Sequence, residues 1–249
     1  MGFGQSGARV GLFGRSHGEL EATKIEIENA GGAARAFRGD VCKFEEVCAA
    51  VDRYSAVWGG VDVLIANAGV QGPIGPFHEQ KPRDWHEVFE TNVLGVFNSC
   101  RAVLPQMVKR RSGKIVVVSG EGAAVPRPYF APYAASKAAL ARFVESIAEE
   151  VRDHNVQVNS ILPGEAYTSM TDEILHAGPA AGSAEVDRAE RTRLTGGVQP
   201  DRQIQLALFL ASERSNHLTG RLIAVQDDWK KFEHENIRHD TWTLRRHLK

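Results

Sequence analysis

A tyrosine and a lysine four residues apart, Tyr133 and Lys137, have the types and spacing for acid–base chemistry in this 249-residue chain. Residues separated by four positions share one face of an α-helix. A lysine ammonium group beside a phenol favours the phenolate and lowers the pKa of the phenol from about 10 towards the working pH, as a general acid or base requires. In the alternative interpretation, both side chains simply extend to solvent.

The residues that follow Lys137 on the same face of this predicted helix are apolar. Their spacing is typical of a side that faces a hydrophobic core. The pattern therefore places Lys137 where a lysine costs free energy unless it is paired. The stripe consists of Leu140, Val144, Ile147 and Val151.

Strands and helices alternate along the whole chain. The apolar, β-branched run 115–118 is bounded by glycine and proline, which predicts a strand buried on both faces. The alternation predicts a parallel sheet with helices on both faces. Residues 165–199 have no steady period and are interpreted as a mobile lid with one or two short helices. The predicted strands are 8–14, 34–37, 61–66, 115–118, 156–162 and 222–225, and the predicted helices are 16–31, 43–58, 84–110, 133–153 and 200–213.

Two of these helices carry further signals. Ser16–Glu19 is interpreted as a capping box that opens the first helix, and Asp84 marks the start of the helix to residue 110. Asn92 lies on the apolar stripe of that second helix, so its amide should be buried and must find partners. It either bends the helix or holds a water, or it forms part of a proton path.

Several chemistry-bearing residues follow directly after predicted strands. In a parallel α/β sheet, ligands bind outside the carboxyl ends of the strands. The convergence of these residues at one edge is stronger support for a site than any single motif. They are Arg15, Asp40, Asn67, Ser119 and Pro163.

At this point the sequence resembles the short-chain dehydrogenase/reductase family over residues 8–226. The resemblance implies a Rossmann-like, doubly wound parallel sheet in a three-layer αβα sandwich, which lacks the first strand of the family. It also implies a single dinucleotide-binding domain over residues 1–249, with 227–249 as a C-terminal extension. The matching motifs are Asp40-Val41, Asn67-Ala68-Gly69, Asn92, the strand to Ser119, Tyr133-x-x-x-Lys137 and Pro163-Gly164-x-x-x-Thr168.

The resemblance also implies roles for these residues. Tyr133 would exchange the proton at the substrate oxygen, and Lys137 would lower the pKa of Tyr133 and bind the nicotinamide ribose. Asn92 would hold a water that links Lys137 to solvent. Asp40 and Val41 would flank the adenine. The remaining cofactor contacts would come from Asn67, Ala68 and Gly69 along the cleft and from Pro163, Gly164, Ala166 and Thr168 at the nicotinamide end.

The cofactor preference is predicted from Gly14-Arg15-Ser16. In dinucleotide-binding folds a carboxylate after the second strand binds the ribose 2′-hydroxyl, whereas a nearby arginine accommodates a 2′-phosphate. No carboxylate stands here, so we favour NADP(H), with NAD(H) as the second choice. An exposed arginine at a helix start is the alternative interpretation of Arg15.

The sequence departs from the family at two places. The first strand and the T-G-x-x-x-G-x-G turn that would hold the pyrophosphate are absent, and Met1–Ser6 resembles the end of the following helix. We expect poor cofactor affinity, either in a shortened version of a normal enzyme, which we favour, or in a degenerate member. The family serine that binds the substrate carbonyl aligns with Gly120. Its neighbour Ser119 is our candidate for that role, and otherwise Ser119 merely ends the strand.

The leading hypothesis is therefore an NAD(P)(H)-dependent oxidoreductase that interconverts a secondary alcohol and a ketone. The alternatives are a non-catalytic binding or scaffold protein, and a lyase or epimerase that uses Tyr133 as a base.

Glu121 and Glu165 fall on loops that border the pocket in the family. Two carboxylates there would suit a hydroxyl-rich or cationic substrate, although such residues are also commonly solvated.

Composition narrows the class of protein. A net charge of −1 gives no electrostatic case for nucleic acid or an anionic membrane, and no apolar run is long enough to span a bilayer. The three cysteines form no C-x-x-C motif, which fits a reduced, cytoplasmic setting, and the nine histidines show no ligand spacing, so no metal site is expected.

The family analogy suggests a homotetramer or dimer built on the helices at 84–110 and 131–153. The tail, with Trp229 and Trp242, would extend a subunit contact or close the pocket.

Overall fold

The fold is built on a parallel β-sheet that is divided into two parts. The computed structural model describes residues 1–235, 237–238 and 241–244. β1 and β2 form one sheet, and the other has the order β3-β4-β5-β6. All of these neighbouring strands run parallel. The strands are β1 (Arg9–Gly14), β2 (Ala33–Arg38), β3 (Val63–Ala66), β4 (Gly113–Val118), β5 (Val156–Leu162) and β6 (Leu222–Ala224).

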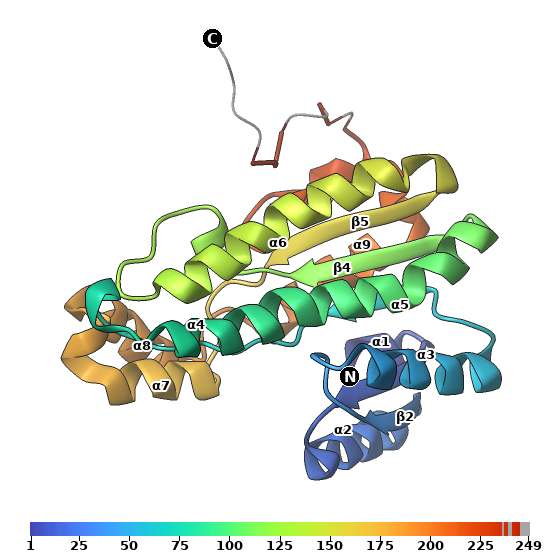
Figure 1. Cartoon of the computed structure of the whole chain (residues 1–249). Coiled ribbons are helices and arrows are strands. Elements are labelled where there is room, and N and C mark those ends of the chain that lie inside the picture. The colour runs from blue at the N-terminus through green and yellow to red at the C-terminus, as the bar shows by residue number, and fades with distance from the viewer. Residues whose placement is uncertain (236, 239–240, 245–249) are drawn as a thin grey trace.

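Helices cover both faces of the larger sheet (Figure 1). α5 and α6 lie on one face and α9 lies on the other, which gives the predicted three-layer, Rossmann-like arrangement. α2 and α3 pack beside the smaller sheet. The helices are α1 (Gly2–Gln5), α2 (His17–Asn29), α3 (Phe44–Trp58), α4 (Pro82–Phe89), α5 (Gly95–Arg110), α6 (Ala131–Glu150), α7 (Ser169–Ala177), α8 (Ser183–Thr195) and α9 (Pro200–Ala211).

The β4 strand joins the two hydrophobic layers of the core. Successive side chains of a strand point to opposite faces. Ile115 and Val117 accordingly pack with Leu140 of α6, whereas Val116 packs with Leu206 of α9. Because both faces of β4 are covered, its carboxyl end, where the candidate residue Ser119 follows, is held rigidly in place.

The division of the sheet falls between β1 and β3, the strands that would flank the first strand of the family. These two strands do not pair with each other in the part of the chain that the structure describes. Val63, Leu64 and Ile65 of β3 are therefore only half-buried, although the strand is as apolar as β4. The two parts are connected through helices instead, since α3 packs against α5.

The predicted helix over 84–110 is interrupted in the structure. α4 begins at Pro82 rather than Asp84, because a proline is well suited to a first helical position, where no N–H bond is required. A π-helical turn, Glu90–Leu94, separates α4 from α5 and contains Asn92. The capping box predicted at Ser16 is wrong in detail, because Ser16 precedes α2 without any side-chain capping hydrogen bond.

The lid predicted over 165–199 contains the two short helices α7 and α8, as expected. Its two ends are joined, because Ala166 and Gly197 form an antiparallel bridge and Val198 N donates to Glu165 O at 2.6 Å. The lid is therefore anchored at its base, beside the carboxyl end of β5.

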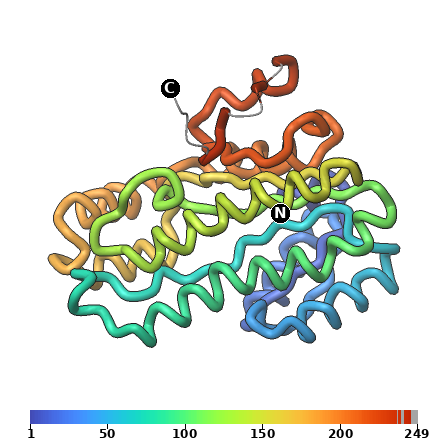
Figure 2. The backbone as a smooth tube through the Cα atoms, turned by 45° about the horizontal axis from the view of Figure 1, so that its top comes forward, coloured from blue at the N-terminus to red at the C-terminus, as the bar shows by residue number. Residues whose placement is uncertain are grey.

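The described part of the C-terminal tail lies apart from the lid (Figure 2). Trp229 packs on Phe209 of α9, with ring centroids 5.4 Å apart, and Trp242 packs on Phe232 at 5.5 Å. None of the described tail residues lines the pocket discussed below, so closure of that pocket by this part of the tail is not observed. The assignment of the whole chain to a single domain, with the tail as an extension, stays a prediction.

Candidate active site

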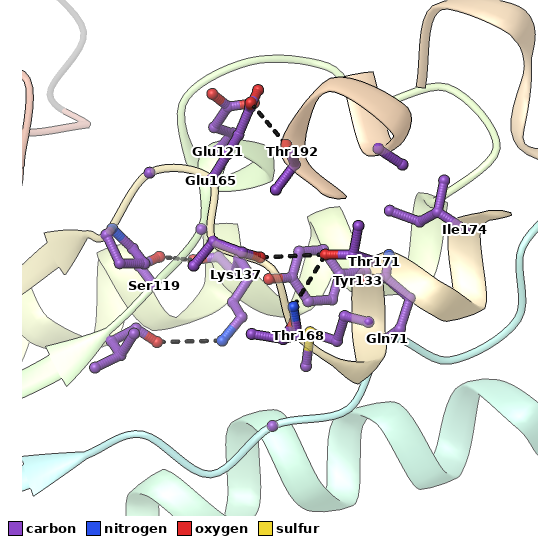
Figure 3. Close-up of a pocket in the computed structure, with 18 of the residues that line it drawn as sticks. Gln71, Ser119, Glu121, Tyr133, Lys137, Glu165, Thr168, Thr171, Ile174 and Thr192 are labelled. Carbon is purple, nitrogen blue, oxygen red and sulfur yellow. Dashed lines mark hydrogen bonds between the residues drawn. The ribbon is translucent and has the colours of Figure 1, made fainter. Parts of the chain in front are cut away.

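A pocket of about 550 Å³ opens at the carboxyl ends of β3, β4 and β5, beneath the lid helices α7 and α8. This is the edge at which parallel sheets bind ligands. Figure 3 shows polar side chains from the strand ends, from α6 and from the lid pointing into it. The lining includes these residues predicted from the sequence: Asn67, Ala68, Gly69, Ser119, Glu121, Tyr133, Lys137, Pro163, Gly164, Glu165, Ala166 and Thr168.

Tyr133 and Lys137 lie on one face of α6, as their spacing predicts. Both are buried, with 9% and 4% of their surface exposed, and both line the pocket (Figure 3). Lys137 Nζ lies 5.5 Å from the centroid of the Tyr133 ring and donates a hydrogen bond to Val118 O at 3.1 Å. The interpretation in which the two side chains extend to solvent is therefore wrong.

Burial dominates the electrostatics of the pair. It lowers the pKa of Lys137 from its ordinary 10.5 to about 8, because the charged form loses its hydration. Burial also raises the pKa of Tyr133, while the charge of Arg127 lowers it and that of Glu121 raises it. The Arg127 guanidinium lies 5.3 Å from the centroid of the Tyr133 ring. Arg127 is thus a cation that favours the phenolate, and the same role for Lys137 stays a prediction.

On the β4 side, Gly120 lies against the Tyr133 hydroxyl. A Cβ atom placed on Gly120 would lie 2.8 Å from Tyr133 Oη. The neighbouring Ser119 is 3% exposed, and its hydroxyl donates to Lys137 O at 3.4 Å. Ser119 lies in the pocket lining with its hydroxyl turned towards the backbone of α6, so its role as a donor to substrate stays a prediction.

Asn92 lies beneath the pocket rather than in its lining. It is fully buried, and the π-helical turn presents its amide to the loop after β3. Asn92 Oδ1 accepts from Val70 N at 2.7 Å, and Asn92 Nδ2 donates to Val70 O at 3.0 Å and to Ser136 Oγ at 3.0 Å. The buried amide therefore finds its partners, as predicted, and it fixes the loop that carries the Asn67–Gly69 motif.

The predicted cofactor cleft is tightly built around Gly69. A Cβ atom at Gly69 would lie 3.3 Å from Asn92 Oδ1 and 3.5 Å from Lys137 Nζ, so a side chain here would fill the space beside these two polar groups. A buried lysine beside a bare backbone is a fitting environment for the hydroxyl groups of a nicotinamide ribose. The residues of the nicotinamide half of the cleft therefore fit the cofactor that the fold implies.

The residues predicted to bind the adenosine half of the cofactor are separate from the pocket lining. Arg15, Ser16, Asp40 and Val41 lie at the carboxyl ends of β1 and β2. The pKa of Asp40 is lowered, chiefly by the backbone N–H of Cys42 and also by the charge of Arg15. Asn98 Nδ2 donates to Val41 O at 2.9 Å and ties this region to α5.

The structure adds pocket residues that the sequence analysis missed. Arg188 of α8 forms ion pairs with Glu121 and with Glu165, the latter at 3.3 Å. Arg127 pairs with Glu185 of α8 at 2.8 Å. The one available signal was the spacing of Glu185 and Arg188, which places them on one face of a helix. The other missed lining residues include Gln71, Thr171 and Thr192.

The comparisons with known proteins agree with this geometry. The family model described as short chain dehydrogenase matches residues 1–178. The chain belongs to the short-chain dehydrogenase family, and it is an NAD(P)-dependent oxidoreductase by that membership.

Individual relatives cover almost the whole chain. The 3beta-hydroxysteroid dehydrogenase 1 of Eggerthella lenta is 35% identical over 226 residues, which are 90% of this chain and 84% of that protein. The 5-keto-D-gluconate 5-reductase of Escherichia coli is 32% identical over 90% of this chain and 86% of its own. The structure of a gluconate 5-dehydrogenase from Burkholderia cenocepacia, in complex with NADP and tartrate, has a TM-score of 0.78 and 28% identity, and the match covers 90% of this chain and 86% of that one.

Two features are absent from the described residues. No helix among them is long and apolar enough to cross a bilayer. No group of three or more histidine, cysteine, aspartate or glutamate side chains within them could hold a metal ion.

Proposed function

We propose that this protein interconverts a secondary alcohol and a ketone, with Tyr133 as the general acid and base. The observation that carries the proposal is the burial of Tyr133 and Lys137 side by side in the pocket. Tyr133 Oη would give its proton to the carbonyl oxygen during reduction and take it back from the alcohol during oxidation. Bound NADP(H) would supply or accept the hydride.

The other residues position these groups. Lys137 would bind the cofactor ribose and would return a proton to Tyr133 through the region of Asn92. Ser119 would turn its hydroxyl towards the substrate oxygen. The remaining predicted contacts, from Asn67 to Gly69 and from Pro163 to Thr168, would orient the nicotinamide end. Each of these side chains or backbone segments lies at or beneath the same pocket, which supports the assignment.

We favour NADP(H) over NAD(H) because Arg15 follows β1 where a carboxylate would bind the ribose 2′-hydroxyl. The exposed position of Arg15 leaves its guanidinium free to meet a phosphate. The NADP bound to the Burkholderia structure is a property of that protein and supports the same choice. NAD(H) is the second choice.

The test is absorbance at 340 nm with NADPH and a panel of ketones, followed by the Tyr133→Phe variant. Wild-type protein should oxidise NADPH in the presence of a substrate ketone. Tyr133→Phe should lower turnover by at least a thousandfold while it binds NADPH with unchanged affinity in a calorimetric titration. Turnover by the variant at the wild-type rate would refute the role of Tyr133.

A non-catalytic binding or scaffold function is the second candidate, and the divided sheet favours it. No strand pairing links β1–β2, which carries the adenosine half of the cleft, to β3–β6, which carries the nicotinamide half, among the described residues. A cofactor that must contact both parts would then bind weakly. Calorimetry that detects no NADPH binding at millimolar cofactor would favour this candidate over the oxidoreductase.

We also propose that the protein is cytoplasmic and forms a homotetramer or dimer through α4–α5 and α6. Phe97 of α5 and Phe143 of α6 pack together with ring centroids 4.1 Å apart and are only half-buried. Leu94, three residues before Phe97 in the chain, is 51% exposed. Such an apolar patch across two helices suits a subunit contact. A single monomeric species in sedimentation analysis would refute the assembly.

A further inference from the structure

The side-chain amide of Gln71 is an unmatched polar group in the wall of the pocket. Gln71 is only 2% exposed, it lines the pocket, and its Nε2 atom is buried with no hydrogen-bond partner. Buried polar groups in folded proteins are normally hydrogen-bonded, because an unpaired one costs free energy. Figure 3 places Gln71 on the side of Tyr133 that faces Thr171 and the lid, across the pocket from Ser119.

Another wall of the pocket is charged, and its two arginines are already paired. It is formed by Arg127, Arg188, Glu121, Glu165 and Glu185. Arg127 bonds to Glu185 at 2.8 Å through Nη2 and at 3.1 Å through Nε. Arg188 is shared by Glu121, Glu165 and Glu185. Three carboxylates therefore face two guanidinium groups. No guanidinium of this wall is left for an anionic substrate.

The carboxylates of this wall keep capacity to accept further hydrogen bonds. The side chains of Glu121 and Glu165 are 44% and 41% exposed, and each carboxylate has about four lone-pair directions. Glu165 Oε2 already accepts from Thr192 Oγ1 at 3.1 Å. A ligand that donates hydrogen bonds to this wall and accepts one from Gln71 would satisfy both sides of the pocket.

We propose that the pocket binds an uncharged, polyhydroxylated substrate, a polyol or the corresponding hydroxyketone, with Gln71 as a specificity-determining residue. The hydroxyl groups of such a molecule can accept from Gln71 Nε2 at one position and donate to Glu121 and Glu165 at others, whereas a carboxylate could only accept and would be repelled by the wall. The inference rests on the proposed function and specifies the substrate class of that same site.

The experiment compares two probes that differ only at one terminal carbon, D-glucitol with its CH₂OH and D-gluconate with its carboxylate. Their affinities are measured by calorimetry, without cofactor, on the wild-type protein and on Gln71→Met and Gln71→Glu. Gln205→Met is the matched control, because Gln205 is exposed on α9 and is not part of this pocket.

D-Glucitol should bind at least tenfold more tightly than D-gluconate. Gln71→Met should weaken the binding of D-glucitol at least tenfold. It should also raise the melting temperature, because it removes an unpaired buried amide nitrogen. Gln205→Met should change neither the affinity nor the melting temperature. Gln71→Glu should also lose affinity, because the side chain no longer donates. The expected rise in melting temperature separates loss of a ligand contact from loss of the fold.

Equal or tighter binding of D-gluconate, absence of D-glucitol binding, or unchanged affinity in both Gln71 variants would overturn the inference. The proposed function is tested separately, by the oxidation of NADPH with simple ketones, measured as absorbance at 340 nm. Ketone turnover without D-glucitol binding would refute the substrate class and keep the oxidoreductase. Binding of D-glucitol that depends on Gln71, without any hydride transfer, would support the binding site and refute the reaction.

Discussion

Replacement of Lys137 by methionine should make the protein more stable and inactive. Burial lowers the pKa of Lys137 from 10.5 to about 8, and each tenfold change in a proton equilibrium corresponds to about 1.4 kcal/mol. The charged lysine therefore costs about 3 kcal/mol at neutral pH. Methionine also gives up the hydrogen bond to Val118 O, which is worth about 1 kcal/mol. The net gain is about 2 kcal/mol, or about 4–8 °C in melting temperature for a domain of this size.

The pH dependence of this gain has a definite sign. Below about pH 8 the lysine carries its proton in both the folded and the unfolded state, so the full cost is present. Between pH 8 and 10.5 the folded state releases the proton first, and the stability of the wild-type protein rises relative to that of Lys137→Met. The advantage of the variant should therefore be largest at pH 7 and close to zero at pH 10, as measured by urea unfolding at both values.

Lys114 provides a matched control at the other end of β4. Burial also lowers its pKa to about 8, but its ammonium group bonds to Asn216 Oδ1 at 2.6 Å and to Ser215 Oγ at 3.3 Å, away from the pocket. Lys114→Met should show the same direction of pH dependence and should keep its NADPH-dependent turnover. A Lys137→Met protein that is less stable than wild type at pH 7, or a stability difference that widens towards pH 10, would refute the reasoning.

Three further outcomes are expected. Asn92→Leu leaves the partly buried backbone N–H and carbonyl of Val70 without their side-chain partner, so urea unfolding should show a loss of about 2 kcal/mol. Gly120→Ala brings a Cβ atom to 2.8 Å from Tyr133 Oη, which should displace the hydroxyl and lower kcat at least tenfold, and Gly120→Ser should retain more activity than alanine does. Arg127→Met removes a charge that lowers the pKa of Tyr133, so the pH profile of kcat/KM for alcohol oxidation should move to higher pH. Glu185→Gln, which leaves that charge uncompensated, should move the profile to lower pH; shifts of equal sign in the two variants would contradict the assignment.

The strands and helices were largely predictable because their signals are local. The β-branched run of β4 and the apolar stripe of α6 each encode one element and the face that it buries. Helix starts were less predictable. At Ser16 and Asp84 the pattern of capping residues was present, but Ser16 forms no capping bond and Pro82 begins the helix earlier. Caps depend on backbone angles of the preceding turn, which a residue pattern does not determine.

The candidate site was predictable where a motif fixes the residues of one element, as with Tyr133 and Lys137. Its charged wall was not, because each contact joins distant segments. Arg127 meets Glu185 across 58 positions of the sequence, and Arg188 meets Glu121 across 67. Such pairs follow from how the lid packs over α6, and no local pattern encodes that packing. The π-helical turn at Asn92 is similar, since it depends on partners in the loop after β3.

The distribution of polar groups that weaken the fold gives an independent argument for the site. Lys114 is buried, yet two side chains compensate its ammonium group. Lys137 is buried with a single backbone partner, and the buried Nε2 atom of Gln71 has none. Both of these groups line the same pocket, beside Tyr133. Groups whose burial is costly and uncompensated persist mainly where a ligand completes their environment. The stability that the protein gives up at Lys137 and Gln71 therefore points to the place where a cofactor and a substrate bind.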